Sequence, residues 1–357
     1  MPVRLTHSSI IGAAISALFA LAAPAAIAAN TTGPNGESAT PASTVTLTPE
    51  EEARIKEGKH TAALAWHTSS DYTTAVDQGA KDEFARLGIE VVATTDAQFD
   101  PARQKSDIET ILAKKPSIIL SLPVDPDTAA EVYRPALEAG VVLGFVDNAP
   151  KGFVHGKDYV TIVSDDLAQM GEKAADALAA AIGGKGKVGY LFHDANFYVT
   201  NQRDQAFKDT IQSKYPEIEI VAEQGLANPT GAEDIINAFL IKNPDLDGVY
   251  VTWAEPAEFV LAALRNNGNT TTKVVTLDLS EPLALDMVKG GNVAAIVADE
   301  AYSIGSTLAR AAAAGLIKKE LPPFLAVDAL AVTKDNLKEG WQQSLHRDPP
   351  ASLSAPQ

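Results

Sequence analysis

The 357-residue chain contains no cysteine. This absence excludes disulfides, cysteine-ligated zinc and thiol catalysis, and it removes the lipid-modified cysteine that could tether an exported protein to a membrane. Basic residues are scarce as well, with 29 Lys and Arg against 46 Asp and Glu, so the formal net charge is −17. Nucleic-acid binding is disfavoured, because neutralising phosphates requires a clustered Lys and Arg surface.

Motifs of the common catalytic and metal-binding classes are also missing. The six histidines form no H-E-x-x-H pair for zinc, and residues 245–248 (DLDG) are too short for a calcium loop. No G-x-G-x-x-G follows the first predicted strand, and no G-x-S-x-G occurs. Residues 183–187 (GGKGK) lack the P-loop spacing and lead from a helix into a strand, the reverse of a P-loop. We therefore expect no metal, no cofactor and no enzymatic activity.

The N-terminus has the features of an export signal. Arg4 precedes an apolar run at residues 10–23, and residues 26–28 (AIA) fit the small-x-small rule for cleavage before Ala29. A run of about 14 residues is too short to span a bilayer comfortably, which favours a cleavable signal peptide at residues 1–28 over a membrane anchor. Residues 29–58 are predicted to be a flexible leader, because their first part is rich in Thr, Ser, Pro, Gly and Ala. We expect a periplasmic monomer without a stable membrane anchor.

Short apolar runs alternate with helical patterns over the rest of the chain. The ten predicted strands are residues 62–66, 89–94, 118–122, 141–146, 160–163, 188–192, 218–222, 248–252, 273–277 and 293–297. Near-continuous apolar runs are typical of parallel strands buried on both faces, and a spacing of roughly 25–30 residues predicts right-handed βαβ crossovers. Five strands precede the predicted helix near Leu167 and five follow it. The expected fold class is α/β, with two doubly wound parallel-sheet lobes.

Polar and aromatic residues gather where these strands end. Asp147, Asp278 and Asp299 each directly follow an apolar run, and ligands of open α/β sheets bind beyond the carboxyl ends of the strands. Carboxylates accept hydroxyl hydrogen bonds, and the Arg203 guanidinium donates several in a planar fork. Trp66 could stack on the C–H face of a sugar, or it could belong to the core. Asp71 and Asp166 could be helix caps, and Arg203 could be a surface residue.

Several segments in order resemble the type I periplasmic sugar-binding proteins, which are ribose-binding-like subunits of ABC transporters. The resemblance runs from about Lys59 to Asn336. It rests on residues 77–83 (DQGAKDE), 142–147 (VLGFVD), the Ser164-Asp165 pair, residues 203–207 (RDQAF) and 274–278 (VVTLD). The resemblance implies three hinge crossings, near Ser164, near Asp299 and at residues 328–331. It divides the chain into a first lobe of residues 59–163 and 300–328, a second lobe of 164–299 and 329–341, and a tail of 342–357.

The same resemblance implies a ligand-binding set between the lobes. Together with Trp66, which the strand-end pattern suggests, its members are Ser70, Tyr72, Asp147, Asn148, Arg203, Asn228, Trp253, Asp278 and Asp299. Three positions differ from the family pattern. This chain has Asn148 where the family has an Arg, Asp299 where it has a neutral amide, and Tyr72-Thr73 where it has a pair of Phe. Three carboxylates against one guanidinium disfavour acidic or phosphorylated sugars. A neutral sugar or sugar alcohol fits best, with an amine-bearing ligand as the second possibility.

The function that these features imply is capture of a sugar or polyol and its delivery to the permease of an ABC transporter. A sugar-sensing partner of a chemoreceptor or histidine kinase is an alternative that the residues leave open. An exported glycoside hydrolase would need two carboxylates flanking a bond, which Asp147 and Asp278 could supply, but no other feature supports it. A sugar-regulated repressor core would share the lobes, but the export signal and the acidic charge oppose it.

Overall fold

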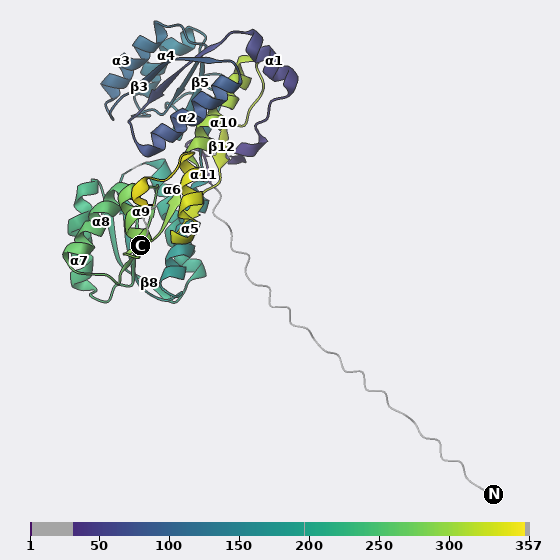
Figure 1. The fold of residues 1–357 in the computed structure, drawn as a ribbon. Helices are drawn as coiled ribbons and strands as arrows, with labels where there is room; N and C mark the ends of the chain where they lie inside the picture. Colours follow the sequence, from purple (N-terminus) through teal and green to yellow (C-terminus); the bar gives the residue numbers. More distant parts are fainter. Residues whose placement is uncertain (2–30, 196, 354–357) are drawn as a thin grey trace.

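The computed structural model describes residues 1, 31–195 and 197–353, which form two α/β lobes stacked end to end (Figure 1). Except for Met1, the predicted signal peptide at residues 1–28 lies outside the described residues. Each lobe is a central sheet covered by helices on both faces. No helix within the described ranges is long and apolar enough to cross a membrane.

The first lobe contains a seven-stranded parallel sheet with the order β1-β12-β6-β5-β4-β2-β3. Its strands are β1 (Thr40–Pro41), β2 (Thr61–Trp66), β3 (Glu90–Asp96), β4 (Ile118–Ser121), β5 (Val142–Val146), β6 (Ile162–Asp165) and β12 (Phe324–Val327). Helices α2 (Asp71–Arg86) and α10 (Ala301–Leu316) pack together over one face, whereas α3 (Pro101–Leu112) and α4 (Ala129–Glu138) cover the other. Strands β2, β4 and β5 are therefore almost wholly buried, as the apolar runs predict.

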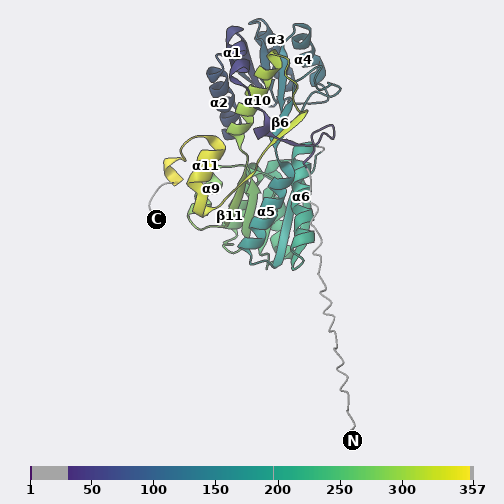
Figure 2. The same cartoon turned by 90° about the vertical axis from the view of Figure 1, so that its right-hand side faces the viewer.

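The second lobe contains a six-stranded sheet with the order β13-β11-β10-β9-β7-β8. Its strands are β7 (Gly186–His193), β8 (Ile218–Leu226), β9 (Gly248–Val251), β10 (Lys273–Leu277), β11 (Val293–Ala298) and the antiparallel β13 (Leu330–Val332). Helices α5 (Leu167–Ala181) and α6 (Tyr198–Lys214) cover one face (Figure 2). Helices α7 (Ala232–Lys242), α8 (Ala254–Asn266) and α9 (Glu281–Val288) cover the other.

Both lobes use the same winding. Strands β3-β2-β4-β5-β6 of the first sheet and β8-β7-β9-β10-β11 of the second have the order 2-1-3-4-5, counted along each lobe. This order places a ligand site at the carboxyl ends of the strands. The chain passes between the lobes after β6, after β11 and between β12 and β13. All ten predicted strands are present, and the two-lobed α/β prediction is confirmed.

The leader differs from its prediction. Residues 31–58 contain β1, which pairs with β12 at the edge of the first sheet, and α1 (Pro49–Glu57). Helix α1 begins with a capping box between Thr48 and Glu51, and its Ile55 is fully buried. The composition predicts a flexible segment because small polar residues dominate it. The expectation fails because Ile55 enters the core of the first lobe and the backbone of β1 pairs with the sheet.

The start of the leader also contacts the second lobe. The Thr31 hydroxyl donates to Asp166 and accepts from the Ala168 amide at 2.8 Å, at the beginning of α5. Gln202 of α6 donates from Nε2 to the Thr32 carbonyl at 2.9 Å, and its Oε1 accepts from the Thr32 amide at 3.0 Å. Residues 31–58 therefore connect the two lobes outside the three crossings.

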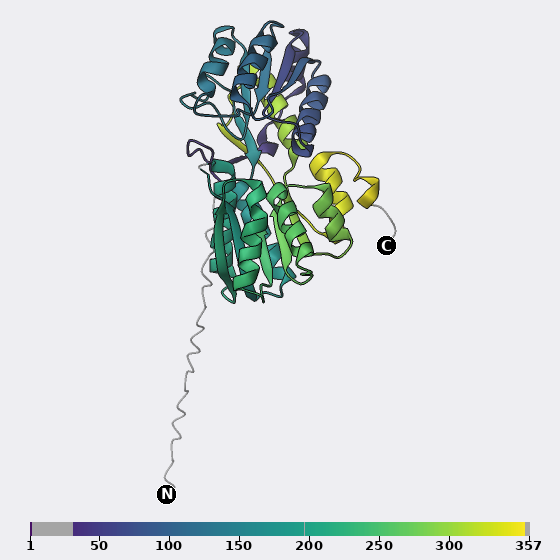
Figure 3. The same ribbon diagram turned by 90° about the vertical axis from the view of Figure 1, so that its left-hand side faces the viewer.

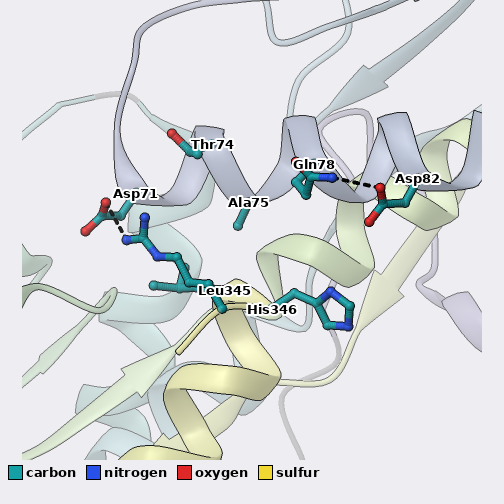
Figure 4. Close-up of a pocket in the computed structure, with 8 residues that line it drawn as sticks. Asp71, Thr74, Ala75, Gln78, Asp82, Leu345 and His346 are labelled. Carbon is teal, nitrogen blue, oxygen red and sulfur yellow. Dashed lines mark hydrogen bonds and ion pairs between the residues drawn. The ribbon is translucent and has the colours of Figure 1, made fainter. Parts of the chain in front are cut away.

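The C-terminal segment forms a second such connection (Figure 3). It comprises α11 (Leu337–Leu345) and residues 346–353, and its Trp341 is fully buried. Arg347 forms an ion pair of 2.6 Å with Asp71 at the start of α2, and the His346 ring lies 3.7 Å from that of Tyr302. A groove of about 310 Å³ separates α2 from this segment (Figure 4). The predicted tail at 342–357 thus begins inside a packed helix.

Candidate functional site

Two aspartates occupy equivalent places in the two lobes. Asp147 directly follows β5, and Asp278 directly follows β10. Both have left-handed backbone angles, with φ of 57° and 65°. Asp is among the few residue types that tolerate this region, and such conformations cluster at functional sites.

Arg203 joins the loops at the ends of β10 and β11. It lies in the first half of α6 and is buried, with 6% of its surface exposed. Its Nη1 lies 3.1 Å from Asp278 Oδ1 and 4.0 Å from Asp299 Oδ1, and its Nη2 donates to the Thr252 carbonyl at 3.4 Å. Burial opposes the positive charge, but the two carboxylates outweigh it and raise the pKa of Arg203. Arg203 Nε is buried without a hydrogen-bond partner among the described residues.

The first lobe contributes Asp147 and Tyr72 to the same group. The Ser164 hydroxyl donates to Asp147 Oδ1 at 2.6 Å. Burial raises the pKa of Asp147 to about 6, although Ser164 and Arg203 of the other lobe favour its ionised form. Burial and the charges of nearby carboxylates from both lobes hold the pKa of Tyr72 well above its usual value. Side chains of the two lobes therefore share one electrostatic environment.

A second carboxyl pair lies beside Arg203. Asp165 is the last residue of β6 and Asp299 directly follows β11, and the two carboxyl groups influence each other's pKa. The Glu300 amide also donates to Asp165 Oδ1 at 3.2 Å. Both aspartates are buried, with 3% and 7% of their surfaces exposed. Asp165 belongs to the Ser164-Asp165 pair of the family resemblance, but it is not a member of the predicted binding set.

Asp204 is a buried residue next to Arg203, and it too is outside the predicted binding set. Its carboxylate accepts the His193 amide at 2.9 Å, the Tyr250 hydroxyl at 2.6 Å and the Thr252 hydroxyl at 2.9 Å. These three bonds attach α6 to β7 and β9, and so they set the position of Arg203. One available signal was the place of Asp204 three residues before the core residue Phe207, on a helix face that should be apolar.

Three residues of the predicted set make hydrogen bonds to residues near them in the sequence. Trp66 is 4% exposed and belongs to the core, and its Nε1 donates to Asp77 at 3.0 Å. It lines a separate pocket of about 220 Å³ beside Asp77. The exposed Ser70 is the N-cap of α2 and accepts the Thr73 amide. The exposed Asn228 caps the turn at Pro229–Gly231. The structure does not bring any of these three into contact with Arg203.

Two further members of the predicted set lie at strand ends. Asn148 is buried, and its Nδ2 has no hydrogen-bond partner among the described residues. Trp253 follows β9 at the start of α8, half-buried, with its ring 4.9 Å from that of His193 in an edge-on contact. Asp71 and Asp166 were the two possible helix caps. Asp166 is the N-cap of α5 and accepts the Gln169 amide. Asp71 is the first residue of α2, and the N-cap of that helix is Ser70.

The arrangement offers hydrogen-bond acceptors from both lobes around one guanidinium. No cluster of His, Cys, Asp and Glu suited to a metal ion occurs among the described residues. Carboxylates accept hydroxyl hydrogen bonds, a single Arg donates them, and the aromatic rings of Tyr72 and Trp253 offer apolar surface. Together these groups provide the chemistry for binding a hydroxyl-rich molecule. Burial strengthens each of these interactions, because nearby water is excluded.

Comparison with known proteins agrees with this chemistry. Residues 62–320 match the family described as periplasmic binding protein domain. The ribose import binding protein of Salmonella typhimurium is 26% identical over 251 residues, which cover 70% of this chain and 82% of the relative.

Two solved structures have the same fold. An ABC transporter solute-binding protein from Agrobacterium vitis, with alpha-D-tagatopyranose bound, has 26% identity and a TM-score of 0.68, covering 79% of this chain and 97% of that one. A carbohydrate transporter solute-binding protein from Agrobacterium radiobacter, in complex with D-arabinose, has 25% identity and a TM-score of 0.67, covering 81% and 99%.

Proposed function

This chain belongs to the periplasmic binding protein domain family, and from that premise we propose that it captures a neutral sugar or sugar alcohol between its lobes and delivers it to the permease of an ABC transporter. The observation that carries the proposal is the group formed by Asp147 and Tyr72 of one lobe with Arg203, Asp278 and Asp299 of the other. A ligand held by this group would touch both lobes, so closing the hinge would bury it.

The charges of the group support a neutral, hydroxyl-rich ligand. Arg203 is already engaged by Asp278, so an anionic ligand would compete with the Asp278 carboxylate for one buried cation. A sugar hydroxyl can donate to a carboxylate and accept from the guanidinium at the same time. Each charge-assisted bond contributes about 1.5–3 kcal/mol, so a few of them are compatible with micromolar binding. The ribose, tagatose and arabinose named for the relatives are molecules of this class.

We further propose that the chain is exported by cleavage after residue 28, acts in the periplasm as a monomer, and catalyses no reaction. A pKa of about 6 would suit Asp147 to act as a general acid, so the absence of hydrolysis needs its own test. Incubation with chromogenic glycosides should release no chromophore.

Thermal unfolding in the presence of candidate ligands tests the proposal. The panel contains D-ribose, D-tagatose, D-arabinose and myo-inositol, with ribose 5-phosphate and glucosamine as the anionic and cationic comparisons. A ligand at about 100 times its Kd should stabilise the fold by about 2.7 kcal/mol. We expect a neutral member to raise the melting temperature. A shift with glucosamine alone would show that the substrate class is wrong.

A further inference from the structure

The C-terminal segment lies beyond residues 62–320, which match the family, and it is attached to the second lobe. Gly340 of α11 packs so closely on β13 that a Cβ atom there would come within 2.7 Å of the Val332 side chain. Further along, the Ser352 hydroxyl donates to Glu281 at the start of α9, at 2.5 Å. Because both β13 and α9 belong to the second lobe, the segment should move with that lobe.

The end of the same segment contacts the first lobe. Arg347 Nη2 lies 2.6 Å from Oδ1 of Asp71, the first residue of α2. The His346 ring stacks on the Tyr302 ring of α10, with 3.7 Å between the ring centroids, and the Tyr302 hydroxyl donates to Asp82 of α2 at 2.9 Å. Alongside these contacts runs the groove between α2 and the segment (Figure 4). Polar and aromatic side chains at the surface therefore make much of this contact.

Helix α11 also contacts the crossing that follows β11. The Ser344 hydroxyl donates to the buried Asp299 carbonyl at 2.6 Å, and Gln343 Nε2 donates to Glu300 Oε1 at 2.7 Å. Hinge residues absorb changes in backbone angles when two lobes rotate. One short helix thus contacts a hinge crossing and the first lobe, so rotation at the hinge should move the segment relative to α2.

The first-lobe contact lies next in the chain to a member of the binding group, because Asp71 directly precedes Tyr72. The two lobes are in contact in this structure, since Tyr198 of α6 packs against core residues of both. The arrangement in which Arg347 meets Asp71 is therefore one in which the lobes are close enough to hold a ligand from both sides.

We propose that the C-terminal segment is a latch, in which the Arg347–Asp71 ion pair and the His346–Tyr302 stack favour the lobe arrangement that holds the ligand. The effect on ligand binding rests on the proposed function, whereas the effect on the lobe arrangement does not. Arg347 is then a positioning residue that acts through Asp71. Both members of the ion pair are almost half exposed, so its removal should raise the Kd for a ligand by about twofold to fivefold.

Distances between the lobes of the ligand-free protein test the latch. The chain has no native cysteine, so spin labels can be attached selectively at Ala102→Cys and Ala227→Cys. Both alanines are exposed and follow β3 and β8, the strands at the sheet edges away from the crossings. We expect Arg347→Ala to add longer inter-label distances, whereas Arg134→Ala, at an exposed arginine of α4, is the matched control and should add none. Identical distributions in these two variants, or shorter distances in Arg347→Ala, would overturn the latch.

Calorimetry with D-tagatose and D-arabinose tests the effect on binding. Arg347→Ala should raise the Kd by about twofold to fivefold, and Asp71→Asn should do the same. The double variant should bind no more weakly than either single variant, because the two residues act through one contact. An unchanged Kd in Arg347→Ala, or additive losses in the double variant, would contradict a role of the ion pair in binding. If neither sugar binds, the proposed function loses support while the spin-label distances still decide whether the segment holds the lobes together.

Discussion

Asp147 and Asp278 are held by the same backbone hydrogen bond in the two lobes. The amide of each donates to the carbonyl of the neighbouring strand at 3.0 Å, to Val163 in the first lobe and to Val297 in the second. Both residues have positive φ. The lobes differ in the partner of the carboxylate, because Asp147 accepts a Ser164 hydroxyl whereas Asp278 pairs with Arg203. Repetition of the turn thus presents two aspartates in different electrostatic states.

Replacing Arg203 with Ala should weaken both binding and folding. Removing one member of a buried ion pair leaves uncompensated carboxylates, which costs about 3 kcal/mol in the free energy of unfolding. Arg203→Lys should recover part of this stability but little of the affinity, because an ammonium lacks the planar fork. Urea denaturation and sugar calorimetry measure the two effects. Unchanged sugar affinity in Arg203→Ala would remove this residue from the binding group.

Asp204→Asn should destabilise the fold by about 1–3 kcal/mol, because an amide cannot accept all three hydrogen bonds and a buried donor is left unpaired. Tyr250→Phe is the matched comparison, since it removes only one of the three bonds and should cost about 1 kcal/mol. Sugar affinity should fall in Asp204→Asn through displacement of Arg203. Equal stability losses in the two variants would show that the other two hydrogen bonds of Asp204, from the His193 amide and the Thr252 hydroxyl, do not contribute.

Stability should increase as the pH falls from about 8 to about 5. Burial is the first cause that raises the pKa of Asp147 to about 6, of Asp165 to about 7, and of Asp299 well above its usual value. Through these three groups the folded state binds more protons than the unfolded state, so their contribution to stability falls as pH rises. Burial lowers the pKa of His67 to about 4, which opposes this trend below about pH 6.5.

Below about pH 4 the trend should reverse. Glu83 has a lowered pKa because hydrogen bonds from Arg86 and Arg310 outweigh its burial, so its contribution disappears on protonation. Urea midpoints measured across the pH range give the profile. Asp165→Asn should flatten the part above pH 5, and a wild-type stability that rises between pH 5 and pH 7 would contradict the prediction.

Thr31→Ala should destabilise the protein by about 1–2 kcal/mol, since its hydroxyl serves the first turn of α5 in the manner of a helix cap. The exposed Thr270 is the control, and Thr270→Ala should change stability by no more than about 0.5 kcal/mol. Chemical denaturation measures the free energy of unfolding of both variants. Equal effects would mean that the leader contributes nothing through this contact.

The C-terminal segment should contribute to the stability of the fold more through the packing of Trp341 than through the Arg347–Asp71 ion pair. Trp341 is fully buried, so Trp341→Ala should cost about 3–5 kcal/mol. Arg347 and Asp71 are each almost half exposed, and such pairs contribute about 0–1 kcal/mol, so Arg347→Ala should have little effect on stability. A larger loss in Arg347→Ala than in Trp341→Ala, seen by thermal unfolding, would reverse this ranking.

Most of the fold could be read from residue order because buried parallel strands leave apolar runs of a recognisable length. The prediction omitted β1, β12 and β13, which have two to four residues each. The two- and three-residue runs of β1 and β13 carry little periodic signal, whereas β12 is as long as β4, which was predicted. The prediction of a flexible leader is wrong for a different reason. The contacts that order this segment join residues as far apart in sequence as Thr31 and Asp166. Local composition contains no information about such partners.

The sequence by itself determined the two α/β lobes and the strand ends at which Asp147, Asp278 and Asp299 stand, because burial on both faces leaves its pattern along the chain. Only the tertiary structure decided the state of each side chain. It placed Trp66 in the core, added Asp165 and Asp204 around Arg203, and set Asp299 against another buried carboxyl. Burial raises the pKa of Asp147 and of Asp299, and a count of acidic residues in the sequence does not show this, because a carboxyl group ionises according to its neighbours and its access to water.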